Sequence, residues 1–429
     1  MQTLIYISVA LIAGLLMSRA AKVLKLPAVT GYLVAGIVIG PFCLGLLGID
    51  AIAFTSIEAV TRLSIISNAA LGFIAFAIGN EFRLAQLKKT GKQATLVGII
   101  QAFTATVFVD AALCAIVYFT KGAKLTYASA LTLGAIAAAT APAATLMVVK
   151  QYKAKGPVTD ILLPIVALDD AVGLVIFAVS FGVAKALIHG SIDVISVVVE
   201  PIVEIIASLL LGAVMGALFT FIERFFHSGS KRTAMSIAFV LMTVAISQTT
   251  FKIGAVTVGF STLLACMMLG TVFCNLCPYS EELMERTDKW TAPLFVLFFV
   301  LSGAELDLSV FSDMTIVIIG IVYIIMRSAG KYLGSDLSCR LAKCEPNIRK
   351  YLGLTLLPQA GVALGMSVTA TELGSEGHIV RNIVLFGVLI YELVGPLLTK
   401  IALTKAGEIK PEGKTSQRDM HKNKVSAKS

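Results

Sequence analysis

Residues 158–187 decide the class of fold, because they read VTDILLPIVALDDAVGLVIFAVSFGVAKAL, an apolar run with two adjacent aspartates near its centre. About 20 apolar residues in a helix are enough to cross the hydrocarbon core of a bilayer. One carboxylate in the middle of such a helix costs at least about 2.5 kcal/mol of insertion free energy. No structural need explains that cost, so Asp169 and Asp170 indicate a function inside a membrane.

The composition of the whole chain also indicates a membrane protein. Of its 429 residues, 57% are hydrophobic and 14% are charged, and the mean hydropathy is +0.89. Soluble proteins average about 25% charged residues, and a soluble domain with this composition would expose large apolar patches. The apolar runs are continuous rather than alternating, so we expect an all-α polytopic protein and not a β-barrel.

The apolar runs predict thirteen transmembrane helices, with the N-terminus outside and the C-terminus in the cytoplasm. The predicted spans are residues 2–19, 28–47, 58–80, 93–118, 126–149, 158–187, 192–221, 233–250, 253–275, 290–307, 314–338, 350–371 and 379–403. In this orientation most of the 35 lysine and arginine residues lie on the cytoplasmic side, as the positive-inside rule requires. The net charge of +9 is therefore explained by topology, and the expected partner is the lipid bilayer, not nucleic acid.

The two ends of the chain differ in character. The first apolar run is followed, not preceded, by its basic residues, which favours an uncleaved first span over a signal peptide. Residues 1–405 form the predicted transmembrane domain. Residues 406–429 are polar and basic without apolar periodicity, which predicts a disordered cytoplasmic tail.

Two short motifs occur twice. Ala28-Val29-Thr30 recurs as Ala255-Val256-Thr257, and Gly79-x-Glu81-x-x-Leu84 recurs as Gly303-x-Glu305-x-x-Leu308, at offsets of 227 and 224. The second copies lie seven spans later, where the chain runs in the opposite direction. This pattern predicts an inverted repeat of five helices, spans 2–6 against spans 9–13.

Corresponding spans of the two repeats are both interrupted. Span five contains Pro142, and span twelve contains Pro358, Gln359 and Gly361. Proline removes a backbone donor and clashes with the preceding turn. Helices broken near the midplane in matching positions of inverted halves mark the binding site of many transporters. We therefore expect crossing broken helices rather than two unrelated proline kinks.

The aspartate pair has the chemistry of proton-coupled cation transport. Burial and mutual repulsion both oppose two charges on Asp169 and Asp170, so at least one carboxyl tends to hold a proton. Such a group takes up either a proton or a hard monovalent cation. Oxygen ligands for the cation are expected from Asp170, Asp169, Thr140 and the carbonyls freed near Pro142.

The expected countercharge lies in span eleven. Arg327 and Lys331 are four residues apart and share one helix face. Lys331 could neutralise Asp169 while the site lacks a cation, and the alternative is that Lys331 reaches towards the membrane interface. Glu392, deep in the last span, is a possible partner of Arg327.

Several of these motifs together resemble the monovalent cation:proton antiporters of the KefB/NapA type. The motifs are Leu26-Pro27-Ala28-Val29-Thr30-Gly31-Tyr32, Gly79-Asn80-Glu81, Leu168-Asp169-Asp170, Gly303-x-Glu305-Leu306-Asp307 and Leu357-Pro358-Gln359-Ala360-Gly361. The resemblance covers about residues 3–403 and implies a homodimer in the plasma membrane of a prokaryote. It implies core helices at about 93–187 and 314–403, dimerisation helices at about 2–80 and 233–307, and a linker helix at 192–221.

The resemblance also implies roles for individual residues. It implies that Asp170 binds the ion, that Asp169 carries a proton and pairs with Lys331, and that Thr140 lies beside the site. An Asp-Asp pair in such families accompanies electrogenic exchange, here two protons per cation. Where the more distant NhaA branch has Thr-Asp-Pro, this chain has Thr140-Ala141-Pro142, so a pH regulation that needs that aspartate is in doubt.

Other functions remain to be compared with antiport. A sodium-coupled symporter of a small organic anion can share this fold, but it should place cationic or amide groups at the broken helices, where we find only Gln359. An intramembrane aspartyl protease needs its two aspartates on different helices, and the adjacent Asp169 and Asp170 of one predicted helix do not fit this requirement. We expect no enzyme activity and no cofactor apart from the transported ions, Na⁺ or Li⁺ with K⁺ as the alternative, and H⁺.

Overall fold

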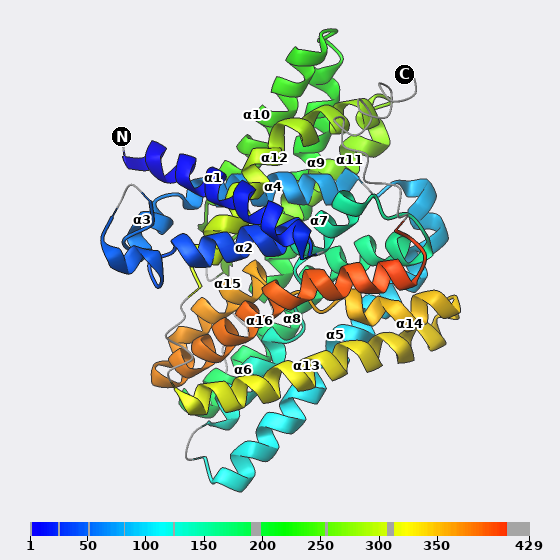
Figure 1. Cartoon of the computed structure of the whole chain (residues 1–429). Coiled ribbons are helices and arrows are strands. Elements are labelled where there is room, and N and C mark those ends of the chain that lie inside the picture. Colours follow the sequence, from blue (N-terminus) through cyan, green and yellow to red (C-terminus); the bar gives the residue numbers. More distant parts are fainter. Residues whose placement is uncertain are drawn as a thin grey trace, which may run out of the picture.

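The computed structural model describes residues 2–24, 26–49, 52–80, 82–122, 125–189, 199–253, 256–306 and 313–409, and these residues are almost entirely helical (Figure 1). The first half contains α1 (Gln2–Val23), α2 (Ala28–Ile39), η1 (Leu44–Leu47), α3 (Ile57–Thr61), α4 (Ser64–Asn80), α5 (Leu84–Thr120), α6 (Tyr127–Ile136), α7 (Pro142–Tyr152) and α8 (Pro157–His189). The second half contains α9 (Glu200–Glu223), α10 (Gly229–Ser247), β1 (Phe251–Ile253), β2 (Val256–Val258), α11 (Thr262–Leu276), α12 (Ser280–Ala304), α13 (Met314–Leu341), α14 (Pro346–Thr355), α15 (Gly361–Ala370), η4 (Thr371–Leu373) and α16 (Ser375–Lys405).

Seven of the described helical segments are long and apolar enough to cross a bilayer: α1, α2 continued through η1, α5, α8, α9, α13 and α16. Their outward faces are apolar as well. On α9, Ile206, Leu210, Val214 and Leu218 follow one another at every turn and are all exposed. A row of exposed aliphatic side chains at helical spacing is what contact with lipid tails requires. The chain is therefore an all-helical polytopic membrane protein.

The helices form two groups, which contact each other where α16 packs on α2, where α8 packs on α9, and through α7. Helices α5, α6, α8 and α13 to α16 pack largely on one another, and α5 and α13 lie side by side in the lower part of Figure 1. Helices α1 to α4 and α9 to α12 form the second group. Helix α7 contacts α8 and α16 of the first group and α2 and α4 of the second.

Glycines allow close helix crossings in the second group. A methyl group added at Gly303 of α12 would lie 2.2 Å from the carbonyl oxygen of Leu33 in α2, and one added at Gly79 of α4 would lie 1.9 Å from the carbonyl oxygen of Met267 in α11. Such contacts between backbones are typical of membrane helices, where small residues let the helices approach.

Two of the predicted spans, 253–275 and 58–80, contain structure that differs from a single continuous helix. The predicted span 253–275 begins as the antiparallel hairpin of β1 and β2, with Phe251 opposite Val258, and α11 starts only at Thr262. The β-branched run Val256-Thr257-Val258 favours a strand over a helix. Ala28 of the first motif copy opens α2, whereas Val256 and Thr257 of the second copy lie in β2, and Ala255 lies outside the described residues. The predicted span 58–80 is interrupted between α3 and α4.

The predicted disordered tail requires a correction at its beginning. Residues 406–409 lie against the start of α8, where the carboxylate of Glu408 accepts hydrogen bonds from the backbone of Val158 at 2.6 Å and of Thr159 at 2.8 Å. These amides are among the unpaired donors at a helix N-terminus, so an acidic residue is stabilised there. Residues 410–429, Glu81, Asp307, Leu308 and the first part of the predicted linker helix, 192–198, lie outside the described residues.

Candidate functional site

The site is built around two breaks in the helices of the first group. Between α6 and α7, and between α14 and α15, the chain leaves the helical path for five residues each, 137–141 and 356–360. The two broken segments touch, since the backbone N–H of Ala141 donates to the carbonyl of Pro358 at 2.8 Å. Pro142 occupies the first turn of α7, where its missing N–H leaves no partner unsatisfied. Gly361 is the first residue of α15.

Arg327 of α13 satisfies carbonyls that the breaks set free. Its guanidinium donates to the carbonyl oxygens of Ala137 at 3.0 Å, Ala139 at 2.6 Å and Leu357 at 2.7 Å. The side chain is completely buried, and its guanidinium carbon lies 4.4 Å from the ring centroid of Tyr391. A planar fork of five N–H donors suits this task, so Arg327 holds the two broken segments together.

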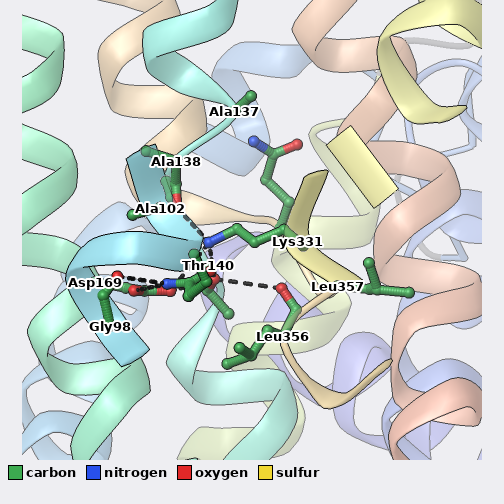
Figure 2. Close-up of polar contacts among 12 residues, drawn as sticks. Gly98, Ala102, Ala137, Ala138, Thr140, Asp169, Lys331, Leu356 and Leu357 are labelled. Carbon is green, nitrogen blue, oxygen red and sulfur yellow. Dashed lines mark hydrogen bonds and ion pairs between the residues drawn. The ribbon is translucent and has the colours of Figure 1, made fainter. Parts of the chain in front are cut away.

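Lys331, one turn further along α13, joins the first break to Asp169 of α8. Its ammonium donates to the carbonyl of Ala138 at 2.5 Å, to Thr140 Oγ1 at 2.9 Å and to Asp169 Oδ2 at 3.1 Å. Figure 2 shows the ammonium end of Lys331 between Ala138 and Thr140, on the side of Asp169. Both charged side chains have no exposed surface. A buried charge is tolerated only when it is paired and hydrogen-bonded, and this pair meets both conditions.

Asp169 has two further donors. Thr140 Oγ1 donates to its Oδ2 at 2.6 Å, and the amide of Gln101, on α5, donates to its Oδ1. Three donors from three different elements therefore surround one carboxylate. This fixes Asp169 in place and stabilises its charged form.

The neighbouring carboxyl of Asp170 has a different environment. It is 2% exposed, and neither of its oxygens has a hydrogen-bond partner among the described residues. It lies at the wall of a cavity of about 500 Å³ that extends along the second half of α8 past Phe177 and Phe181. The far part of this cavity is lined by charged residues: Lys185, Glu200, Glu204 and Glu372. A carboxyl without a hydrogen-bond partner among the described residues, at the end of a cavity that acidic side chains line at its far part, can take up a proton or a cation.

The remaining residues predicted at the site are placed as follows. The amide of Gln359 donates to the carbonyl of Ile136 at 3.0 Å and contacts the hydroxyl of Tyr323, so it supports the break rather than facing Asp170. The predicted pairing of Glu392 with Arg327 is wrong. Glu392 is 3% exposed, its Oε2 has no partner among the described residues, and Arg327 is used by three carbonyls instead.

The structure thus divides the predicted residues into two sets. Asp169, Thr140 and Lys331 lie in one hydrogen-bonded cluster, and Asp170 lies next to it on the face of α8 that borders the cavity. Sequence reasoning missed Gln101 as a partner of Asp169. Its signal was an amide in the middle of the apolar run 93–118, where an unpaired polar group would be unfavourable.

Paired and unpaired carboxylates beside two touching helix breaks, in an all-helical membrane fold, define a secondary ion transporter. Residues 7–405 match the family described as sodium/hydrogen exchanger, transmembrane, and the chain belongs to this family. It is 23% identical over 406 residues to the Na(+)/H(+) antiporter NhaS4 of Synechocystis sp., a match that covers 93% of this chain and 95% of the relative.

Two structures of the sodium proton antiporter MjNhaP1 from Methanocaldococcus jannaschii are similar in fold. One, at pH 8, is 20% identical with a TM-score of 0.68 and covers 96% of this chain and 100% of that chain. The other is 19% identical with a TM-score of 0.72 and covers 95% of this chain and 98% of that chain.

Proposed function

We propose that this protein exchanges sodium ions for protons across the membrane and that Asp170 is the group for which the two ions compete. The observation that carries this proposal is the environment of Asp170, which is buried at the end of a cavity and has no hydrogen-bond partner for either oxygen within the described part of the chain. A buried carboxylate without a partner is unfavourable by several kcal/mol. Asp170 therefore holds either a proton or a cation, and the state in which it holds none is short-lived.

The first half of the exchange follows from this competition. A sodium ion that reaches Asp170 through the cavity displaces the proton, so that the carboxylic acid and Na⁺ become a sodium carboxylate and H⁺. The acidic residues along the cavity, Glu200, Glu204 and Glu372, raise the local concentration of cations.

A second proton would come from the Asp169–Lys331 pair. When Asp169 also coordinates Na⁺, the ammonium of Lys331 loses the carboxylate that now lies 3.1 Å away and releases a proton. Lysine, unlike arginine, can become neutral when buried. One cation then replaces two protons, which makes the exchange electrogenic. Thr140 and the carbonyl of Ala138, which now bind Lys331, would become available as oxygen ligands.

The architecture that we propose agrees with this mechanism. The protein is an antiporter of the KefB/NapA type with thirteen spans, an inverted repeat of five helices and a cytoplasmic C-terminus. It works as a homodimer in the plasma membrane. The first group of helices would move as the core that carries the ion. The second would be the static dimerisation domain, with α9 as the linker.

The alternative, a sodium-coupled symporter of an organic anion, is less well supported. An anion entering the cavity would meet Glu200, Glu204, Glu372 and Asp170, with Lys185 as a single cation that is already paired with Glu372 at 2.6 Å. The guanidinium of Arg327 is occupied by three carbonyls. The cavity thus has the charge expected for a cation.

Transport in proteoliposomes tests the function. With an imposed pH gradient and a pH-sensitive dye, we expect Na⁺ and Li⁺ to collapse the gradient without any organic solute, and K⁺ to do so less well. Asp170→Asn should be inactive. If the wild-type protein gives no dye signal with these cations unless an organic anion is added, the result would support the symporter.

A further inference from the structure

The last turn of α7 makes two polar contacts with the second group of helices. The ammonium of Lys150 lies 2.7 and 2.8 Å from the two carboxylate oxygens of Asp288 on α12. These side chains are 26% and 33% exposed. The pair therefore joins an element next to the ion site with a helix of the other group, at the end of the molecule where α8 begins.

The next residue of α7 makes the second contact. The side-chain oxygen of Gln151 accepts a hydrogen bond of 2.9 Å from the backbone N–H of Ala28, the first residue of α2. This N–H is one of the donors that a helix leaves unpaired at its N-terminus. Two consecutive side chains of α7 thus hold two different helices of the second group. We call Lys150, Gln151, Asp288 and the N–H of Ala28 the clasp.

A cavity lies beside the clasp but does not reach the ion site. It measures about 840 Å³, is bordered by Lys150 and Asp288, and ends at Leu163, Pro164 and Phe295. Leu163 and Phe295 belong to one buried apolar cluster. From Leu163 to Asp170 is seven residues along α8, or roughly 10 Å at 1.5 Å per residue. Of the two cavities described, Asp170 borders the one of about 500 Å³ and not this one, so its access lies towards the end of α8 rather than towards its beginning.

We propose that Lys150 and Gln151 are positioning residues that keep the cavity at the start of α8 separated from the ion site. In this way they set the balance between the two access states of the transporter. This inference rests on the proposed exchange by alternating access. Opening the cavity at the start of α8 requires α7 and α8 to move away from α2 and α12, and that movement separates both halves of the clasp. The clasp belongs to one access state only, so it biases the equilibrium without touching the ion.

The size of the bias follows from the exposure of the pair. A partly exposed ion pair contributes little, and its loss shifts a two-state equilibrium by about two- to five-fold. The Gln151 contact adds a similar factor, because an ordinary hydrogen bond has a comparable net effect. Removing both should shift the equilibrium by roughly ten-fold towards the state that is open at the start of α8.

The test uses the full-length protein and three variants, Asp288→Ala, Gln151→Ala and the charge-swapped Lys150→Asp/Asp288→Lys. Lys289→Gln is the matched control, because it breaks the ion pair of Lys289 with Glu285, which lies on α12 alone and is 73% and 72% exposed. Hydrogen–deuterium exchange is followed at the end of α7 and the start of α8. The apparent KM for Na⁺ is measured in right-side-out and inside-out vesicles.

We expect Asp288→Ala and Gln151→Ala each to speed deuterium uptake at the ends of α7 and α8 and to lower the KM for Na⁺ two- to five-fold from the side where α8 begins. The KM from the opposite side should rise. The charge swap should restore the wild-type balance, and Lys289→Gln should change nothing. Wild-type uptake and wild-type KM on both sides in Asp288→Ala and Gln151→Ala would overturn the clasp, whereas absence of exchange in the wild type would overturn the proposed function instead.

Discussion

Replacing Lys331 by glutamine tests how the buried charges at the site depend on each other. The lysine and Asp169 have no exposed surface, and the ammonium makes contacts of 2.5, 2.9 and 3.1 Å with Ala138, Thr140 and Asp169. Removal of one partner of a buried ion pair costs about 3–5 kcal/mol. Thr140 and Gln101 still donate to Asp169 in the variant, so we expect the lower end, about 3 kcal/mol of unfolding free energy.

A double-mutant cycle separates the pair from simple loss of packing. Lys331→Gln, Asp169→Asn and the double variant are unfolded in detergent, and the double variant should recover most of the stability that Lys331→Gln loses, because no unpaired charge remains. Lys185→Gln serves as the control, since its pair with Glu372 is 38% and 56% exposed and should contribute less than about 1 kcal/mol.

The same variant has a second readout in transport. Without a titratable amine, one cation should exchange for one proton, so that the rate no longer depends on the membrane potential in proteoliposomes. The reasoning is refuted if Lys331→Gln unfolds like the wild type and its exchange still responds to the potential.

Four further substitutions, one of them a control, test the scaffold by thermal unfolding. Arg327→Lys should cost roughly 1–3 kcal/mol, because the compact ammonium lacks the spread of the guanidinium fork and leaves at least one of the three buried carbonyls unpaired; a wild-type midpoint would contradict the role of the guanidinium. Glu408→Ala should cost about 1–2 kcal/mol by removing the acceptor at the start of α8, and an unchanged midpoint would mean that this contact does not form. Gly303→Ala should be strongly destabilising, because its methyl would lie 2.2 Å from the Leu33 carbonyl oxygen, while Gly365→Ala, with open space around it, should be nearly neutral; equal effects would contradict the packing of α2 on α12.

Much of the site follows from the sequence because the cost of burying a charge is local. Asp169 and Asp170 are expensive in any membrane helix. Proline removes a backbone donor wherever it stands, although Pro164, Pro293 and Pro396 lie inside continuous helices of this chain. Lys331 is the residue that the sequence singles out as countercharge to Asp169, and the structure places its ammonium within 3.1 Å of that carboxylate. These properties belong to single residues and need no knowledge of the packing.

The partners of the other charges could not be predicted in this way. Arg327 had a carboxylate, Glu392, as its apparent partner, but its guanidinium donates to carbonyls freed at the two breaks instead. Gln101 contacts Asp169 only because α5 packs beside α8. Helical spacing shows which residues share a face but not which helix that face meets.

Boundaries were missed where local propensity and tertiary contacts act together. The predicted span 253–275 is apolar enough to cross a membrane, but its residues 256–258 form a strand that pairs with β1. Glu408 follows the last helix in a polar segment, and its order depends on the unpaired N–H groups at the start of α8, which are more than 200 residues away in sequence.

Proton release on sodium binding tests the central claim most directly. Purified protein in weakly buffered detergent solution is titrated with NaCl, with choline chloride as the control for ionic strength, and the pH is recorded. If Na⁺ and H⁺ compete for Asp170, the wild type releases protons as Na⁺ saturates and Asp170→Asn releases none. Sodium binding that releases no protons from the wild type, or the same release from Asp170→Asn, would contradict the account.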